Sequence, residues 1–334
     1  MGIKLTLETY EKMSKDQKVT VFLLSSNRRE YIGLEIEAIL RQTYSDFQLV
    51  ILDNFSNDGT KELVDSFEDD RIHFVQRHSL DESPNYKYAF EICATEYLVV
   101  LHDDDIVEDT YLETVLEKIE NSNFVSVSAG ASIIDENGKT TGKFIKSDED
   151  IVYEGNDYLL NFLSAKPVPI VFPTAIYRKK FYGNLENFFK CEAGPARDQV
   201  IWFQTGRFGG KIFILEKTLI KYRIHSNQDS VINSGFMEIK LIDSLLSDPF
   251  YYEIIKTMRQ YYIRHFVWLR YCSFTKRYYT GLLTKEQFDA FFDYKCVDFI
   301  KKTFRGKICY MIMSIIHHCP LTGALIKLLL KIKK

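Results

Sequence analysis

Three consecutive aspartates, Asp103 to Asp105, follow the apolar run 97–101, with only His102 between them. Two unit charges about 4 Å apart repel by about 4 kcal/mol at an effective dielectric of about 20, so the triplet predicts a nearby cation. Carboxylate oxygens are the ligands that Mg²⁺ and Mn²⁺ prefer. The alternative is a helix start, in which Asp105 or Asp109 caps the next helix and the acids favour its dipole.

The usual glycine-rich phosphate loops are absent from the first 130 residues. That stretch contains only Gly2, Gly33, Gly59 and Gly130, so neither GxGxxG nor GxxxxGK[ST] can follow a strand there. The sequence therefore argues against nicotinamide cofactors and P-loop chemistry. If a diphosphate binds, its charge must be neutralised by other means, and a metal ion held by the aspartates is the natural agent.

Short β-rich apolar runs alternate with helical periodicity over the same stretch, which predicts βαβ units and a mostly parallel central sheet flanked by helices. We expect strands at 19–25, 48–53, 71–76, 97–101 and 124–130, and helices at 30–42, 59–67, 85–94 and 109–120. In such sheets the ligand crevice lies beyond the carboxyl ends of the strands. The polar residues expected there are Asn27, Arg28, Asp53, Asn54 and the three aspartates.

Two stretches carry a resemblance to a known family. VFLLSSNRREYIGLEIEAILRQTYSDFQLVILDNFSNDGT (21–60) and SPNYKYAFEICATEYLVVLHDDDI (83–106) resemble the N-terminal half of family 2 glycosyltransferases. The resemblance implies a GT-A fold, which is a Rossmann-like α/β domain that binds a nucleotide-diphosphate sugar and holds a divalent metal with an acidic DxD-type motif. His102 occupies the first acidic place of the family's LDxDD form, so the roles of the individual aspartates stay open.

The resemblance also assigns roles in donor binding. Asp53 matches the aspartate that hydrogen-bonds the base, usually uracil; turn capping in DNFSNDGT is the alternative, which Asp58 fits better. Asp103 would lie by the ribose or diphosphate, and Asp104 or Asp105 would hold the metal, with Asp104 also near the donor. The remaining donor-binding set includes Arg28 and Lys87, and for these two residues a solvated surface charge is the alternative. That set is Ser26, Asn27, Arg28, Asn85, Lys87 and Arg223.

Two later motifs extend the resemblance. GPARDQVIWFQTGRFGG (194–210) resembles the segment with the catalytic base, so Asp198 is the candidate general base that takes a proton from an acceptor hydroxyl. Arg197 stands where the family has an acid, and helix capping or an ion pair with Arg197 is the alternative for Asp198. LIKYRIHSNQDS (219–230) resembles the closing strand, which makes His225 a candidate metal ligand or diphosphate contact and Arg223 a partner of the departing phosphates. A purely structural His225 is the alternative.

The expected function follows from this resemblance. A single base carboxylate without a nucleophile motif implies direct displacement, which inverts the anomeric configuration. We expect an inverting glycosyltransferase that uses a UDP-sugar, with Mn²⁺ or Mg²⁺, and a saccharide acceptor, lipid-linked, in bacterial surface glycan synthesis. The alternatives are a metal-dependent nucleotidyltransferase and a non-catalytic nucleotide-sugar or saccharide-binding module.

The composition shifts after Gly235 toward Tyr, Phe, Leu and Lys with helical spacing. We therefore expect a GT-A domain over 1–235 and a helical C-terminal region over 236–334. From Phe299 onward the sequence has eight Lys or Arg residues and no acid, and it closes on ALIKLLLKIKK. This basic amphipathic tail is expected to bind an anionic membrane surface, with core packing as the alternative.

The overall charge and the cysteines limit the class of protein. A formal net charge of −3 and a pI of about 6.2 argue against nucleic acid as a partner. The six cysteines show no CxxC spacing, and the N-terminal residues show no secretory apolar segment. These features favour a cytoplasmic protein, and the basic tail adds the expectation that it is peripheral at the inner face of the plasma membrane.

Overall fold

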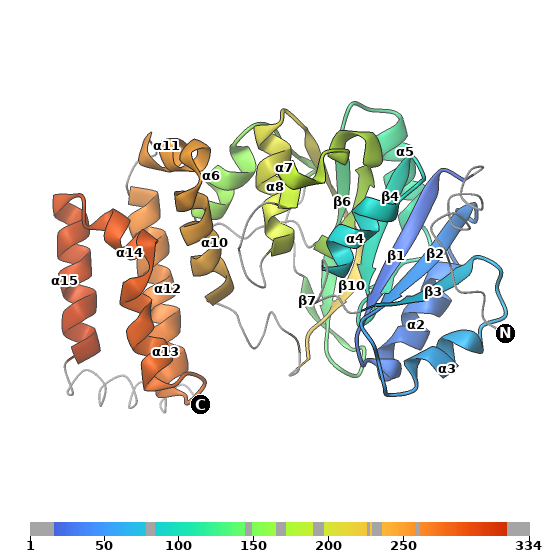
Figure 1. The fold of residues 1–334 in the computed structure, drawn as a ribbon, viewed down its shortest axis with the longest axis horizontal. Coiled ribbons are helices and arrows are strands. Elements are labelled where there is room, and N and C mark those ends of the chain that lie inside the picture. The colour runs from blue at the N-terminus through green and yellow to red at the C-terminus, as the bar shows by residue number, and fades with distance from the viewer. Residues whose placement is uncertain are drawn as a thin grey trace. The chain divides into compact units, whose positions relative to one another are not determined.

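The computed structural model describes residues 17–77, 84–143, 149–164, 172–189, 197–225, 228, 236–257 and 261–318 (Figure 1). The chain forms two compact units. The first, here the sheet unit, consists of Met1–Tyr158, Pro167–Lys190 and Ile201–Ser226. The second, here the C-terminal unit, consists of Leu159–Lys166, Cys191–Val200 and Asn227–Lys334. The expected domains, 1–235 and 236–334, stay a prediction.

One sheet of ten described strands forms the centre of the sheet unit. The strand order is β3-β2-β1-β4-β9-β6-β10-β5, with β7 beside β6 and β8 beside β10. Its first half is a parallel array of β1 (Val19–Ser25), β2 (Phe47–Asp53), β3 (Ile72–Gln76) and β4 (Tyr97–His102). All of β2 and nearly all of β1 is buried, which explains the continuous apolar runs in the sequence. The predicted strands in this half are confirmed.

The other half of the sheet is mixed. β6 (Ser126–Ile134) runs parallel to β10 (Ile212–Arg223), while β9 (Ala175–Arg178) runs antiparallel between β4 and β6. β5 (Ile106–Val107) and β8 (Ile151–Tyr153) pair antiparallel with β10, and β7 (Thr140–Lys143) pairs antiparallel with β6. The α/β fold with a flanked central sheet is confirmed. The pairs among β1 to β4 and the pair of β6 with β10 are parallel, as predicted, and the other described pairs are antiparallel.

Helices follow the strands as the periodicity predicts. α2 (Arg29–Leu40), α3 (Thr60–Asp65), α4 (Asn85–Ile92) and α5 (Tyr111–Glu120) come after β1, β2, β3 and β5 and flank the sheet (Figure 1). α5 is typical, because its apolar side chains at helical spacing are the buried ones. α2 differs, because Glu35 lies among its buried apolar residues.

Further short elements complete the middle of the chain: α6 (Asp157–Leu163), η1 (Phe172–Thr174), η2 (Lys179–Tyr182), α7 (Leu185–Phe189) and α8 (Arg197–Arg207). α8 approaches the loop after β8 at Gly206. A Cβ atom there would lie 1.7 Å from the carbonyl oxygen of Gly155, so only glycine permits this contact.

The described part of the C-terminal unit is helical, as predicted for the region after Gly235. Its elements are α10 (Phe236–Ser247), α11 (Pro249–Thr257), α12 (Tyr261–Tyr279), α13 (Lys285–Asp289), η4 (Ala290–Asp293), α14 (Lys295–Ile300) and α15 (Phe304–His318). Asp243 of α10 accepts the backbone N–H groups of Lys295 and Cys296 at 2.8 and 2.9 Å, and so caps α14. Within the described ranges, no helix combines the length and the hydropathy of a membrane-spanning segment. The tail at 319–334 lies outside the described residues.

Candidate functional site

The strand ends bring the expected site residues together. In the parallel register Ser25 of β1 lies opposite Asp53 of β2, and Leu24 lies opposite His102 of β4. The loops after these three strands therefore start at one edge of the sheet (Figure 1). This edge is where α/β sheets bind their ligands.

Asp103 is buried and is held by the loop after β1. Its Oδ2 accepts the Ser26 N–H at 3.1 Å, and its Oδ1 accepts a hydrogen bond from the Arg28 guanidinium at 3.0 Å. Burial raises the pKa of Asp103 to about 7, against the opposing effect of the Arg28 charge. The structure thus brings the expected residues Ser26 and Arg28 to the aspartates.

Asp104 contacts side chains from two other strand ends. Its Oδ2 lies 3.1 Å from Arg28 Nη1 and 3.0 Å from Nε2 of His225, which follows β10. Its Oδ1 is buried and has no hydrogen-bond partner among the described residues. A buried carboxylate oxygen without a partner is costly, so this oxygen marks a place where a cation fits.

Asp105 is buried beside the last residue of β10. Its Oδ1 accepts the backbone N–H of Arg223 at 2.9 Å, while its Oδ2 is buried with no hydrogen-bond partner in the part of the chain that the structure describes. Burial, and then the charge of Asp104, raise the pKa of Asp105 well above its usual value. Asp105 is therefore the second carboxylate of the cluster with a buried oxygen that lacks a hydrogen-bond partner among the described residues.

The Arg223 side chain is 2% exposed and binds backbone carbonyls. Its guanidinium donates to the carbonyl oxygens of Asp104, Asp135 and Glu136 at 2.8 to 3.1 Å and lies 4.6 Å from the ring centre of Tyr31. These contacts join the aspartate loop to the loop after β6. In its described contacts Arg223 therefore holds these two loops together, and its role toward departing phosphates stays a prediction.

A group of three side chains could hold a metal ion. His102, Asp104 and Asp105 each offer one ligand atom, and these atoms lie within 4.8 Å of one another. Two carboxylates and an imidazole suit Mn²⁺ and similar divalent ions. The two buried carboxylate oxygens without a hydrogen-bond partner among the described residues are free to bind such an ion. Burial lowers the pKa of His102, which favours the neutral imidazole that coordination requires. The sequence analysis did not name His102 as a metal ligand, although its place within the acidic motif was the available signal. The role of His225 as a metal ligand stays a prediction.

The loop after β2 is organised around Asp53, which is fully buried. Asp53 Oδ2 accepts the Ser56 N–H at 2.9 Å and the Gln76 side-chain amide at 3.1 Å. Asn27, at φ 51°, donates its N–H to Ser56 Oγ at 2.7 Å, so the loops after β1 and β2 are joined. Asp58 accepts the Thr60 N–H at 3.1 Å, which is the turn-capping contact that the sequence favoured for it. Asp53 therefore has a turn-forming role, and its role toward a base stays a prediction.

Asn85 and Lys87 begin α4 in different environments. The Asn85 side chain accepts from Arg77 at 2.8 Å and donates to the Leu52 carbonyl at 3.0 Å, directly before Asp53. Lys87 lies 3.4 Å from Glu91 one turn later, as an i,i+4 ion pair, and its role toward the donor stays a prediction. Arg77 is a buried cation that sequence reasoning missed, and its position immediately after β3 was the only signal.

Glu35 is a second residue that sequence reasoning missed. It is fully buried on α2, where its Oε2 accepts the Val107 N–H at 3.0 Å. Burial, and then the charge of Asp105, raise its pKa well above the usual value. An acid within the apolar face of a predicted helix was the signal that marked it.

The candidate base could not be placed by its side chain. Asp198 is the second residue of α8, and its side chain lies outside what the structure describes. Its role as general base stays a prediction.

Comparison with known proteins agrees with this geometry. Residues 20–185 match the model of the family described as Glycosyl transferase family 2. TuaG of Bacillus subtilis (strain 168), named for teichuronic acid biosynthesis, is 29% identical over 218 residues, which cover 64% of this chain and 81% of TuaG. The GalNAc(5)-diNAcBac-PP-undecaprenol beta-1,3-glucosyltransferase of Campylobacter jejuni is 25% identical over 264 residues, which cover 73% of this chain and 80% of that enzyme.

The match covers a smaller part of other relatives. The chain spans 65% of the length of an uncharacterized glycosyltransferase of Nostoc sp., to which it is 26% identical. It spans 38% and 31% of two uncharacterized glycosyltransferases of Rickettsia felis and Rickettsia bellii.

A solved structure shares the fold. The crystal structure of S. aureus TarS 1–349 in complex with UDP superposes with a TM-score of 0.60 at 15% identity, covering 93% of this chain and 88% of that chain. The complex of the same protein with UDP-GlcNAc gives 0.59. This likeness shows the GT-A fold. The family match, the fold and the acidic cluster at the strand ends together place this chain in family 2 of the glycosyltransferases.

Proposed function

We propose that this glycosyltransferase transfers a sugar from a UDP-sugar to a saccharide acceptor, with inversion at the anomeric carbon. The observation that carries the proposal is the meeting of the three aspartates with Arg28 and His225 at the ends of β1, β4 and β10. Such a cluster suits a diphosphate whose charge a divalent cation offsets. The TarS structures with UDP and UDP-GlcNAc support the donor class.

In this proposal His102, Asp104 and Asp105 hold Mn²⁺ or Mg²⁺, with His225 beside them. A divalent metal bound by these residues would supply Lewis-acid stabilisation of the charge on the leaving diphosphate. Arg28 adds a positive charge, while Asp103 orients Arg28 and the loop after β1. The rest of the proposed donor site is Ser26, Asn27, Asp53, Asn85, Lys87 and Arg223.

Asp198 is the proposed general base. Its carboxylate takes the proton from the acceptor hydroxyl while that oxygen attacks the anomeric carbon and the bond to the diphosphate breaks. Attack from the face opposite the leaving group inverts the configuration. An aspartate is ionised at neutral pH and can accept this proton, because its ordinary pKa is about 3.9.

The proposed acceptor is a lipid-linked saccharide of a bacterial surface glycan, used at the cytoplasmic face of the membrane. The names of the B. subtilis and C. jejuni relatives support this, since one refers to teichuronic acid and the other to an undecaprenol-linked saccharide. The basic tail would help to hold the enzyme at that surface.

The test is a panel of nucleotide sugars with MnCl₂ or MgCl₂, in which release of nucleoside diphosphate is followed with and without EDTA. We expect release from a UDP-sugar that EDTA abolishes, with an acceptor-dependent increase. Asp198→Asn should abolish transfer and leave UDP binding unchanged; transfer at the normal rate would remove Asp198 from its role. Release of pyrophosphate would favour the nucleotidyltransferase, and UDP-sugar binding without turnover for any acceptor would favour the binding module.

A further inference from the structure

The outer face of α15 exposes apolar side chains in a regular pattern. They fall 4, 7, 8 and 11 positions after the first, which places them within an arc of about 100° on a helix that turns about 100° per residue. Gly306 and Met313, on the opposite side, are buried. We call the exposed set the apolar stripe: Phe304, Ile308, Met311, Ile312 and Ile315, with exposed fractions of 79, 39, 54, 41 and 57%.

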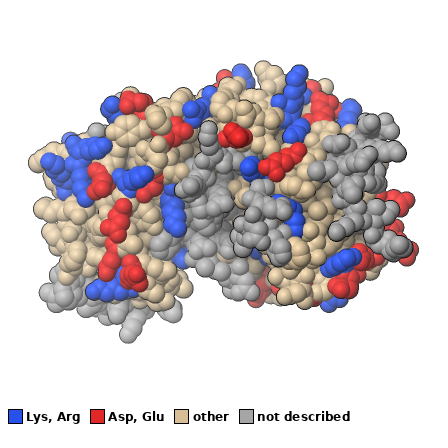
Figure 2. All heavy atoms as spheres, in the orientation of Figure 1, with Lys and Arg blue, Asp and Glu red and all other residues tan. Residues whose placement is uncertain are grey.

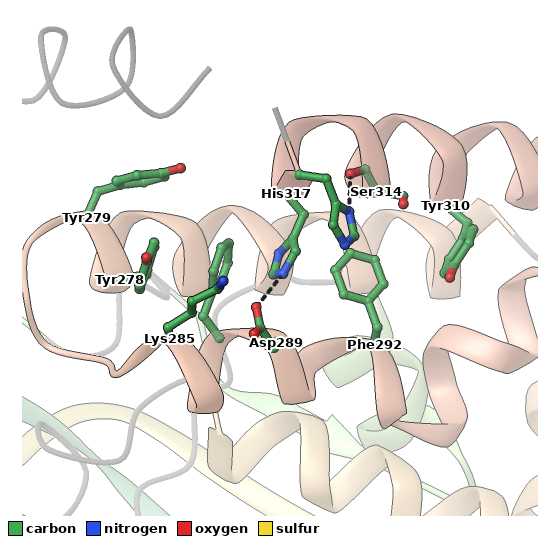
Figure 3. A pocket seen from close by; sticks show the side chains of 10 residues that line it. Tyr278, Tyr279, Lys285, Asp289, Phe292, Tyr310, Ser314 and His317 are labelled. Atoms are coloured by element: carbon green, nitrogen blue, oxygen red, sulfur yellow. Dashed lines mark hydrogen bonds and ion pairs between the residues drawn. The ribbon is translucent and has the colours of Figure 1, made fainter. Parts of the chain in front are cut away.

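The inner side of α15 is anchored within the C-terminal unit. The Tyr271 hydroxyl of α12 donates to the Met313 carbonyl at 2.8 Å, and His317 Nε2 lies 2.8 Å from Asp289 of α13. Figure 3 shows His317 pointing from α15 toward Asp289 at a pocket of about 670 Å³ that Phe292 also lines. Because these contacts fix the inner side, the apolar stripe faces outward.

Basic residues border the apolar stripe on both sides. At about 100° per residue, Arg305 lies next to one edge of the arc and Lys307 next to the other. Figure 2 shows Lys and Arg side chains gathered near the start of α15, at the left. The sequence has no Asp or Glu from Phe299 to His318. The residues of α15 itself therefore carry basic and no acidic side chains, and the neighbouring acids Asp289 and Asp298 lie 2.8 and 2.6 Å from His317 and Lys301.

A groove of about 330 Å³ adjoins the apolar stripe between α12 and α15. Arg264 and Trp268 of α12 and Arg305 and Ile308 of α15 line it. Guanidinium groups bind phosphate with charge-assisted hydrogen bonds, and Trp prefers the boundary between apolar and polar surroundings. The groove thus joins a phosphate-binding chemistry to an apolar surface.

We propose that the apolar stripe and this groove dock onto an anionic lipid bilayer, with the stripe in the interface and Arg264 and Arg305 on lipid phosphates. The charge favours this occupant over a second copy of the chain, which would bring one basic border against another. The proposal places the membrane contact on α15, which belongs to the basic region that begins at Phe299, and adds α12 to it; the sequence pattern had not indicated α12. It rests on the proposed function only in that such a surface would bring a lipid-linked acceptor within reach.

The test is flotation of the full chain with vesicles. We expect the protein to float with vesicles of phosphatidylcholine containing 30% phosphatidylglycerol, and not with phosphatidylcholine alone, and the bound fraction should fall as salt is raised. Met311→Ser combined with Ile315→Ser should weaken partitioning at least tenfold, and Arg305→Gln about fivefold. Leu282→Ser is the matched control, because Leu282 is 65% exposed in the turn after α12. Circular dichroism of each variant verifies the fold.

Three results would overturn the proposal. They are flotation of the double variant at the wild-type level, no flotation of the wild type with anionic vesicles, and a wild-type dimer in solution that the double variant dissociates. Release of UDP with a soluble acceptor should be the same in the wild type and the double variant. Failure of the proposed function would instead abolish that release and leave flotation intact.

Discussion

Replacement of Asp104 by Asn tests the acidic cluster most directly. The ligand atoms of His102, Asp104 and Asp105 lie within 4.8 Å of one another, so two ionised carboxylates there repel by at least about 3.5 kcal/mol at an effective dielectric of about 20. A bound divalent cation removes this repulsion. At 100 times its dissociation constant, a ligand of the folded state adds about 2.7 kcal/mol to the free energy of unfolding. For a unit of this size we expect Mn²⁺ to raise Tm by about 5 to 10 °C.

Asp104→Asn should keep most of the metal-free stability. The side-chain amide oxygen can still accept a hydrogen bond from His225, and Arg28 keeps its hydrogen bond of 3.0 Å to Asp103. The change in the free energy of unfolding without metal is therefore expected to be within about 1 kcal/mol. The Mn²⁺-induced rise in Tm, by contrast, should fall below about 2 °C, because one of the two charged ligands is lost.

Tryptophan fluorescence can isolate the sheet unit. The chain has two tryptophans, with Trp202 in the sheet unit and Trp268 in the C-terminal unit, so Trp268→Phe leaves one reporter. Thermal unfolding is followed in EDTA and in stepped MnCl₂. Asp109→Asn is the matched control, since that side chain is 59% exposed and its change of charge is the same. A wild-type Mn²⁺ response in Asp104→Asn, or none in the wild type, would refute the reasoning.

Three further predictions concern single acidic residues. Because the pKa of Asp103 is raised to about 7, its stabilising contribution is complete below about pH 4 and is lost as pH rises through 7, by about 4 kcal/mol in total in EDTA. Urea unfolding should show about 2.5 kcal/mol of this fall between pH 5 and 8, and Asp103→Asn should remove that part of the pH dependence. Glu35→Leu leaves the Val107 N–H without its acceptor and should lower the free energy of unfolding, measured with urea, by about 1 to 3 kcal/mol. Glu35→Gln retains an acceptor oxygen and should lower it by less than about 1 kcal/mol. Equal losses in the two variants would contradict the hydrogen-bond argument. Asp243→Ala removes the acceptor of two N–H groups at the start of α14. It should lower the free energy of unfolding of the C-terminal unit by about 2 kcal/mol, as measured by Trp268 fluorescence, and Asp243→Asn should lower it by about half as much. No loss in either variant would count against the cap.

Much of the parallel half of the sheet could be predicted, and the site only in part. Strands 19–25, 48–53 and 97–101 were evident because central parallel strands are buried on both faces and appear as apolar runs. The insertion of β9 between β4 and β6 was not evident, because four residues of ordinary β character do not specify a partner strand. Similarly, Arg223 was predicted to bind phosphate from its motif, whereas its described contacts are backbone carbonyls that meet only in the folded chain.

The sequence by itself determined the chemical inventory: three adjacent acids after a buried strand, no glycine-rich phosphate loop, and polar residues at successive strand ends. The tertiary structure decided which of these groups meet. Arg28 reaches Asp103 across 75 residues, and His225 reaches Asp104 across 121. The physical reason is that local propensity acts over a few residues, while ion pairs between distant loops depend on strand order and register. Burial, which raises the pKa of Asp103 and Asp105, likewise exists only in the folded chain.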